Sequence, residues 1–296
     1  MINKKLSGMG VALITPFRND DTIDFHALGR LIEYQIESKT DYLVICGTTA
    51  ETPTLSDEEI IEIKQFVVNK VAGRCPIVIG IGGNNTKAVV NKISTTDLSG
   101  IDAILSVTPY YNKPTQEGLF LHYAAVCKAS PVPVILYNVP GRTGVNMTAE
   151  TTVRIAKELP NACAIKDASC NLEQAELILQ SKPADFMLIS GDDESTFDLI
   201  KSGAAGVISV IGNAFPREFR QMVQLALKGD YENAGRMHHS FEKLFHLAFV
   251  EGNPAGVKSM LTHMEYIENE LRLPLVSTTA ETHEMIKMAI NELKHL

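Results

Sequence analysis

The sequence predicts a (β/α)8 TIM barrel, a fold of the α/β class, with a helical extension at its C-terminal end. Three observations favour this class. Eight short apolar, β-branched runs alternate with longer runs of helical period, and the short runs start about 20 to 35 residues apart. The short runs are apolar on successive residues, which is typical of parallel strands covered on both faces. Eight strand–helix units in sequence order are the pattern of this barrel.

The predicted strands, in order along the chain, are GVALIT (10–15), YLVIC (42–46), PIVIG (76–80), DAILSV (102–107), PVILYN (133–138), ACAIK (162–166), FMLIS (186–190) and GVISVI (206–211). Helix-capping residues stand between these runs. Asp24 is a good N-cap for the helical run that follows it, and Ser56 with Glu59 forms a capping box ahead of the next helix. Thr148 is a candidate cap for the helix before the sixth strand. A doubly wound sheet is disfavoured, because no G-x-G-x-x-G follows the first strand.

Strand patterns stop after about residue 225. The remaining sequence predicts helices over roughly 230–250, 254–264 and 279–295, with prolines between them. We therefore expect two parts, a catalytic barrel over residues 1–225 and a helical extension over residues 226–296.

Composition excludes several classes of function. The chain of 296 residues has 27 basic and 35 acidic side chains, a net charge of −8, and no basic run, so nucleic-acid binding is disfavoured. No apolar run approaches the roughly 20 residues that a membrane span needs. The five cysteines are odd in number, widely spaced and without a C-x-x-C pair. This pattern predicts reduced thiols and a cytoplasmic location.

Candidate catalytic residues are sought at the carboxyl ends of the strands, where barrel active sites lie. Lys166 closes a strand of small and apolar residues. Burial there would disfavour the charged ammonium, and a neutral amine can attack a carbonyl carbon to form a Schiff base. The alternative is a structural lysine in a salt bridge at the rim, with Asp167 or another acid.

Three other strand ends carry polar candidates. Tyr137 ends the strand next to that of Lys166, and a phenol can transfer a proton. Tyr110 and Tyr111 lie between two prolines in an aromatic loop, which suits a role in the site or, alternatively, packing or an oligomer contact. Thr48 and Thr49 lie on a turn that follows a glycine, where hydroxyl and backbone N–H groups can bind a carboxylate. Arg142 lies in a Pro-Gly-Arg-Thr-Gly loop, and its guanidinium can also bind a carboxylate. The alternative is an ordinary exposed arginine.

The eight histidines do not form a metal-binding pattern, since no H-x-x-x-H pair has a glutamate between its members. The sequence also lacks the G-x-S-x-G of a serine hydrolase. We therefore expect no metal site.

Taken together, the strand-end motifs resemble those of the dihydrodipicolinate synthase / N-acetylneuraminate lyase superfamily of class I aldolases. The motifs are GTTAE (47–51), VTPYYNKP (107–114), ILYNVPGRTG (135–144), AIKDAS (164–169) and GVISV (206–210). They occur in matching order at matching strand ends. The resemblance spans essentially the whole chain, because GNPAGVKSML (252–261) and LRLPLV (271–276) in the extension are also similar.

The resemblance implies a role for each matching residue. Lys166 would form the Schiff base with pyruvate. The residues implied to relay protons are Tyr137, Thr49 and Tyr111, the last reaching into a neighbouring subunit's site. The pyruvate carboxylate would be bound by Thr48, Thr49 and the backbone at Ile208. Because the iminium itself withdraws electrons, no metal or organic cofactor would be required.

Within the superfamily, Arg142 favours the branch that condenses pyruvate with aspartate semialdehyde for lysine and diaminopimelate biosynthesis. The arginine there holds the carboxylate of the aldehyde substrate. The alternative is another pyruvate-dependent aldolase, such as an N-acetylneuraminate lyase. The resemblance further implies a homotetramer built from two tight dimers. Ala50 is a departure, since the family usually has glycine there, and alanine tolerates a positive φ poorly.

Overall fold

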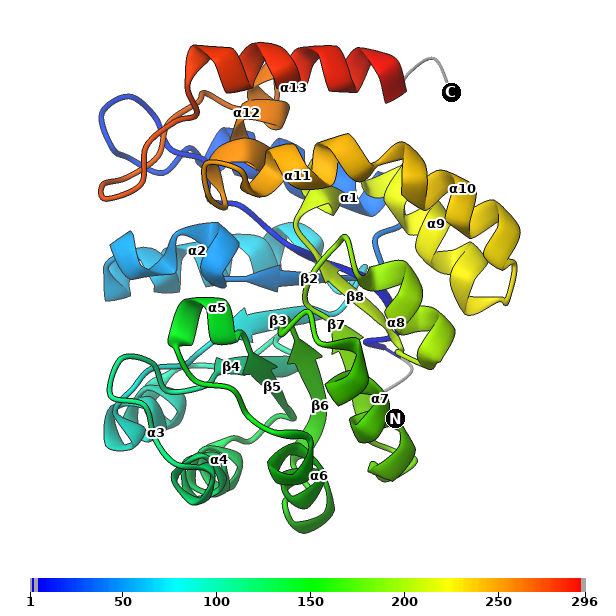
Figure 1. The fold of residues 1–296 in the computed structure, drawn as a ribbon. Coiled ribbons are helices and arrows are strands. Elements are labelled where there is room, and N and C mark those ends of the chain that lie inside the picture. The colour runs from blue at the N-terminus through cyan, green and yellow to red at the C-terminus, as the bar shows by residue number, and fades with distance from the viewer. Residues whose placement is uncertain (1, 3–4, 294–296) are drawn as a thin grey trace.

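The computed structural model describes residue 2 and residues 5–293. Eight parallel strands close into a barrel in sequence order, which confirms the predicted fold class (Figure 1). The strands are β1 (Gly8–Ala12), β2 (Tyr42–Ile45), β3 (Ile77–Gly80), β4 (Ala103–Val107), β5 (Val134–Asn138), β6 (Ala162–Asp167), β7 (Met187–Ser190) and β8 (Gly206–Ser209).

The first strand begins and ends earlier than predicted. β1 pairs with β8 from Gly8 onward, and it ends at Ala12 although the apolar run continues to Ile14. Beyond the strand, the backbone N–H of Ile14 donates to the side-chain oxygen of Asn213 (3.1 Å) instead of to a strand. The chain after β1 is thus held by the residues that follow β8.

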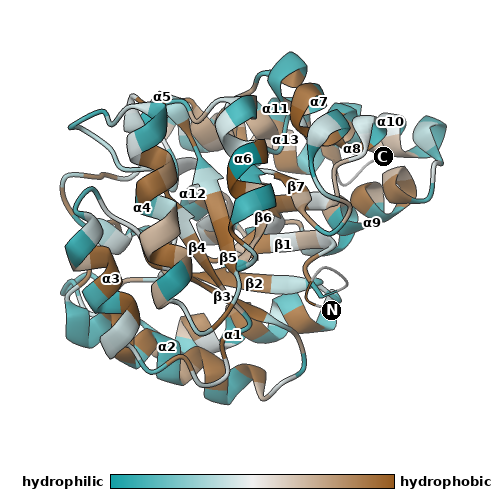
Figure 2. Cartoon of the chain, turned by 90° about the horizontal axis from the view of Figure 1, so that it is seen from below, coloured by the Kyte–Doolittle hydropathy of each residue, from teal (hydrophilic) through white to brown (hydrophobic). Residues whose placement is uncertain are grey.

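A helix follows each strand and packs outside the barrel. Figure 2 shows the strands as largely apolar at the centre, with polar residues along the outer sides of the helices. The barrel helices are α1 (Phe25–Glu37), α2 (Asp57–Val71), α3 (Thr86–Thr95), α4 (Gln116–Ala129), α6 (Ala149–Glu158), α7 (Leu172–Ser181), α8 (Thr196–Ser202) and α9 (Pro216–Leu227), and the short α5 (Pro140–Thr143) precedes α6. The predicted caps at Asp24, Ser56 and Thr148 are all present.

Four helices make up the extension: α10 (Tyr231–Ser240), α11 (Glu242–Phe249), α12 (Ala255–His263) and α13 (Ala280–Leu293). The single helix predicted over 230–250 is two helices, separated at Phe241. The Phe241 ring is buried against the rings of Phe215 and Phe219 on the barrel side, so the chain turns around this anchor. Residues 294 and 295, the end of the last predicted helix, lie outside the described residues.

The extension lies across one end of the barrel, where α11, α12 and α13 stack at the top of Figure 1. Helices α11 and α12 contact the short 3-10 turn Ile211–Asn213 that follows β8. The expected boundary at residue 225 falls within α9, which ends two residues later. We propose to divide the chain after α9, since that helix completes the eighth strand–helix unit.

Candidate active site

Lys166 and Tyr137 lie side by side at the carboxyl ends of β6 and β5. They are paired in the strand register, and the lysine Nζ lies 4.4 Å from the centre of the tyrosine ring. Both side chains are buried, at 5% and 7% exposure. The barrel thus brings together two residues that the sequence singled out separately.

No acidic side chain within residues 5–293 forms an ion pair with Lys166. The neighbouring Asp167 points to the other face of the strand, as successive strand residues do. Its carboxylate accepts hydrogen bonds from Asn138 Nδ2 (3.0 Å) and Ser169 Oγ (2.8 Å), and burial raises its pKa. The rim salt bridge considered from the sequence is therefore wrong for Asp167, and the Lys166 amine is left with an aromatic neighbour.

The Thr48–Thr49 segment forms one turn of 3-10 helix, Thr48–Ala50, after β2. Residues on both sides of this turn have positive φ, 52° at Cys46 and 56° at Glu51, whereas Ala50 does not. A side chain at Gly80 would lie 2.0 Å from the Cys46 carbonyl oxygen, so this glycine makes room for the sharp bend. The alanine found in place of the family's glycine therefore occupies ordinary backbone.

The two threonines of this turn face different surroundings. Thr48 lines a cavity of about 380 Å³ together with Tyr110, Tyr137 and Arg142. Thr49 is 2% exposed, and its Oγ1 accepts a hydrogen bond from Asn253 Nδ2 of the extension (3.0 Å). Thr48 is thus turned toward the tyrosines and Thr49 toward the C-terminal part of the chain.

Arg142 lies on the short helix α5, directly after β5, and lines the same cavity. Thr143 Oγ1 lies within hydrogen-bond distance of the Val139 carbonyl (3.2 Å) and the Val145 carbonyl (2.9 Å) and donates its one proton between them, which holds this tight segment in place. Among the described residues, no carboxylate pairs with the Arg142 guanidinium. Its donors are therefore free for an anionic ligand.

Tyr111 is the candidate that this chain does not bring into the site. It is 89% exposed and has a positive φ of 72°. Its neighbour Tyr110 lines the cavity instead. Tyr111 therefore does not line the cavity of its own chain.

Ile208 lies in β8 and is fully buried. Its neighbours in the register are residues of β1. Just beyond the strand, one carboxylate oxygen of Asp193 accepts hydrogen bonds from the backbone N–H groups of Val210 (3.0 Å) and Ile211 (2.7 Å). Asp193 is 1% exposed, and burial raises its pKa to about 6. The sequence analysis did not single out Asp193.

A buried ion pair that the sequence did not single out fixes the turn to the extension. Glu51 Oε1 lies 2.5 Å from Lys258 Nζ, and both side chains are fully buried. Glu51 Oε2 also accepts from the Arg272 backbone N–H (3.0 Å). The sequence feature that points to this ion pair is a lysine within the apolar run AGVKSML. The partner of that lysine lies 207 residues earlier in the chain, so the run alone does not reveal it.

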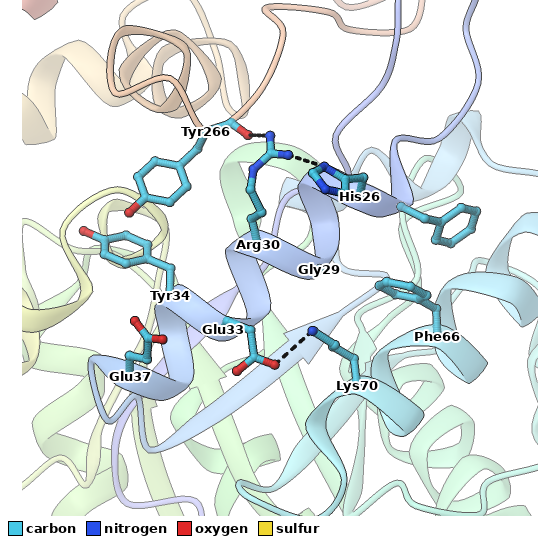
Figure 3. A pocket seen from close by; sticks show the side chains of 10 residues that line it. His26, Gly29, Arg30, Glu33, Tyr34, Glu37, Phe66, Lys70 and Tyr266 are labelled. Carbon is cyan, nitrogen blue, oxygen red and sulfur yellow. Dashed lines mark hydrogen bonds and ion pairs between the residues drawn. The ribbon is translucent and has the colours of Figure 1, made fainter.

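A larger cleft of about 600 Å³ lies along the outer side of α1 and holds none of these candidates (Figure 3). Three of its charged side chains, Arg30, Glu33 and Lys70, are paired with another charged side chain or with the backbone. Glu33 pairs with Lys70 and Arg74, and Arg30 donates to the Tyr266 carbonyl (2.8 Å). This cleft is not the site of the chemistry that the sequence predicts.

Within the described part of the chain, no group of three or more His, Cys, Asp or Glu side chains could hold a metal ion. In that part, none of the helices combines the length and the apolar character that a membrane span requires.

Comparison with known proteins places this geometry in a family. The model of the dihydrodipicolinate synthetase family matches residues 5–293. The 4-hydroxy-tetrahydrodipicolinate synthase of Parabacteroides distasonis is 60% identical over 293 residues, which are 99% of each chain. The fold is similar to a monomeric dihydrodipicolinate synthase variant (37% identity, 99% of each chain, TM-score 0.96). It is also similar to the Acinetobacter baumannii dihydrodipicolinate synthase in complex with pyruvate (37% identity, 98% of this chain and 100% of that one, TM-score 0.95).

Proposed function

The chain belongs to the dihydrodipicolinate synthetase family, and from this premise we infer that it carries out the 4-hydroxy-tetrahydrodipicolinate synthase reaction. It is a lyase of the class I aldolase type, acting in lysine and diaminopimelate biosynthesis. It condenses pyruvate with aspartate 4-semialdehyde. The observation that carries the mechanism is the buried Lys166 amine, which has Tyr137 beside it and no carboxylate partner among the described residues.

The chemistry proceeds through a Schiff base on Lys166. The Lys166 nitrogen attacks the keto carbon of pyruvate, and the carbinolamine loses water to give an imine. The protonated imine acidifies the pyruvate methyl group, which loses a proton to form an enamine. The enamine carbon attacks the aldehyde carbon of the semialdehyde. The amino group of the adduct then attacks the imine carbon, closes the ring and releases Lys166. The iminium accepts the electrons, so the proposed route uses no cofactor.

Tyr137 is the proposed proton-transfer group at the Schiff base, since its ring lies against the lysine Nζ. The family resemblance implied Thr49 as a member of the relay. The geometry favours Thr48 for that step, because Thr48 lines the same cavity as Tyr137. Tyr111 would complete the relay from a neighbouring subunit, which its exposure supports.

The carboxylates of the two substrates are proposed to bind to different residues. Thr49, Thr48 and the backbone at Ile208 are proposed to bind the pyruvate carboxylate. Arg142 is proposed to bind the carboxylate of the semialdehyde, because its guanidinium lines the cavity and has no acidic partner in the described chain. In a protein of net charge −8, two substrates that each carry a carboxylate need such local donors.

We further propose a homotetramer of two tight dimers in the cytoplasm. The outward Tyr111 supports a shared site across the tight dimer. The five cysteines, all free thiols, suit a reducing compartment. Sedimentation analysis would test the assembly, and a monomer as active as the tetramer would contradict the role given to Tyr111.

The decisive experiment is to trap the Schiff base. The protein is incubated with pyruvate and borohydride, and the modified peptide is identified by mass spectrometry. We expect a single reduced adduct, on Lys166, and none when pyruvate is omitted. No adduct, or adducts spread over surface lysines, would contradict the mechanism. Supplying N-acetylneuraminate in place of aspartate semialdehyde tests the alternative lyase, for which turnover of that sugar acid would be the supporting result.

A further inference from the structure

We infer that Asn253 is a positioning residue, which directs the Thr49 hydroxyl proton toward the pyruvate carboxylate. This inference rests on the proposed function, since it assigns a partner to the carboxylate-binding threonine. It gives the C-terminal extension a part in substrate binding, although the extension carries none of the candidate catalytic residues.

The contact itself is short and buried. Asn253 lies between α11 and α12, and its Nδ2 donates to Thr49 Oγ1 at 3.0 Å across 204 residues of sequence. The two side chains are 7% and 2% exposed. This is the one side-chain hydrogen bond of Thr49 within the described chain.

The direction of this bond decides what Thr49 can do next. A hydroxyl has one proton to donate and two lone pairs to accept with. Because Asn253 fills one lone pair of Thr49, the hydroxyl proton stays available for another acceptor. A donor bond into a hydroxyl also polarises it and strengthens its own donation. A carboxylate is the acceptor that gains most from such a donor.

The turn that carries Thr49 is held close to Asn253 by a second connection. Glu51, two residues after Thr49, pairs with Lys258, five residues after Asn253. Thr15 Oγ1 also donates to the Ala50 carbonyl (2.8 Å). Both ends of the Asn253–Thr49 bond therefore lie on backbone that is fixed before substrate arrives, as preorganised binding requires.

The opposite arrangement, with Asn253 accepting from Thr49, would consume the proton that the carboxylate needs. Aspartate at position 253 can only accept when ionised, so Asn253→Asp imposes that arrangement. Alanine at position 253 offers Thr49 neither a hydrogen-bond donor nor an acceptor. The two substitutions thus separate a donor role of Asn253 from an acceptor role.

A double-mutant cycle tests whether Asn253 acts through Thr49. The steady-state KM for pyruvate, kcat and the thermal midpoint are measured for Asn253→Ala, Thr49→Val and the double variant. We expect each single variant to raise the pyruvate KM by roughly tenfold, with a smaller effect on kcat. The double variant should be no worse than the more affected single variant, because both remove the same interaction.

The charge of aspartate needs its own control. We expect Asn253→Asp to raise the pyruvate KM several-fold more than Asn253→Ala. In the Thr49→Val background residue 49 has no hydroxyl proton for the introduced aspartate to accept. The ratio of the pyruvate KM of the Asp variant to that of the Ala variant should therefore shrink to what charge repulsion alone gives. An Asp variant that binds pyruvate better than the Ala variant would show that Asn253 accepts, and would overturn the inference.

Asn161→Ala is the matched control for loss of a structural amide. Asn161 Nδ2 donates to three backbone carbonyls ahead of β6 (2.9 to 3.1 Å) and touches no candidate site residue. It should lower the thermal midpoint and leave the pyruvate KM unchanged. If Asn253→Ala behaves like this control, or if its effect multiplies with that of Thr49→Val, the positioning role is wrong. Failure of the wild-type protein to form the borohydride adduct would instead contradict the proposed function.

Discussion

Two buried lysines in this molecule have similar surroundings but opposite pairing. Each places its Nζ 4.4 Å from the centre of an aromatic ring, Lys166 over Tyr137 in the barrel and Lys258 over Phe17 at the extension. Lys258 also pairs with Glu51 and donates to the Glu270 carbonyl (2.8 Å). Lys166 has no such partner among the described residues.

The difference teaches how one fold keeps one lysine reactive and another inert. Burial lowers the pKa of Lys258 to about 8, against the opposing pull of Glu51. A carboxylate and a carbonyl then occupy its donors, so the amine contributes only to structure. The Lys166 nitrogen has neither kind of partner among the described residues and is open to substrate, so the protein retains a buried, unpaired amine as the cost of catalysis.

The largest expected effect is on activity at Lys166. Lys166→Met should lower kcat by roughly 10⁴-fold or more, because no other amine can form the Schiff base. The thermal midpoint should not fall, since the change replaces an unpaired buried amine by an apolar side chain of similar length. Steady-state kinetics measure the expected loss of kcat, and a thermal melt on the same preparation checks the unchanged midpoint. A large drop in stability would mean that Lys166 has a structural partner.

At Lys258, substitution by methionine should instead lower the stability of the protein. Lys258→Met leaves the Glu51 carboxylate buried without its cation, which typically costs about 3–5 kcal/mol of unfolding free energy. Denaturant unfolding would measure this loss. Lys243→Met is the control, because the Lys243–Glu292 pair is exposed and should change stability little. Equal stability of Lys258→Met and wild type would show that the buried pair is not holding the turn.

The contrast also marks what the sequence could predict. All eight strands were found from local apolar runs, and Lys166 with Tyr137 followed because strand ends meet at one side of a barrel. The sequence analysis did not identify Lys258, Asn253 or Asp193, because each acts through a partner that is distant in sequence or on a loop backbone. No local pattern carries that information. Thr48 and Thr49 were located together, but which of them faces the cavity depends on side-chain directions that only the folded chain fixes.

Asp193 is a third buried ionisable group, and it has only neutral donors. Its pKa is raised from 3.8 to about 6, chiefly by burial. A raised folded-state pKa contributes stability that is complete below about pH 4 and is lost as the pH rises through 6. We expect the unfolding free energy of wild type, relative to Asp193→Asn, to fall by roughly 2 kcal/mol across this window.

Denaturant unfolding of both proteins at several pH values between 4 and 7 would measure this difference. Subtracting the variant removes the carboxylates whose pKa is lowered, such as Glu33, because they titrate alike in both proteins. A difference that stays flat, or that grows with pH, would contradict the raised pKa of Asp193.

The smallest expected effect concerns the turn that Lys258 holds. Ala50 is 3% exposed and has no positive φ, while the left-handed positions are its neighbours Glu51 and Cys46. Ala50→Gly should therefore destabilise the protein by about 0.5–1 kcal/mol, since glycine adds backbone entropy to the unfolded chain and gains nothing here. The pyruvate KM should stay unchanged, because the Glu51–Lys258 pair and the Thr15 hydrogen bond fix the turn from outside position 50. An Ala50→Gly variant that is more stable than wild type would show that the turn is strained by alanine.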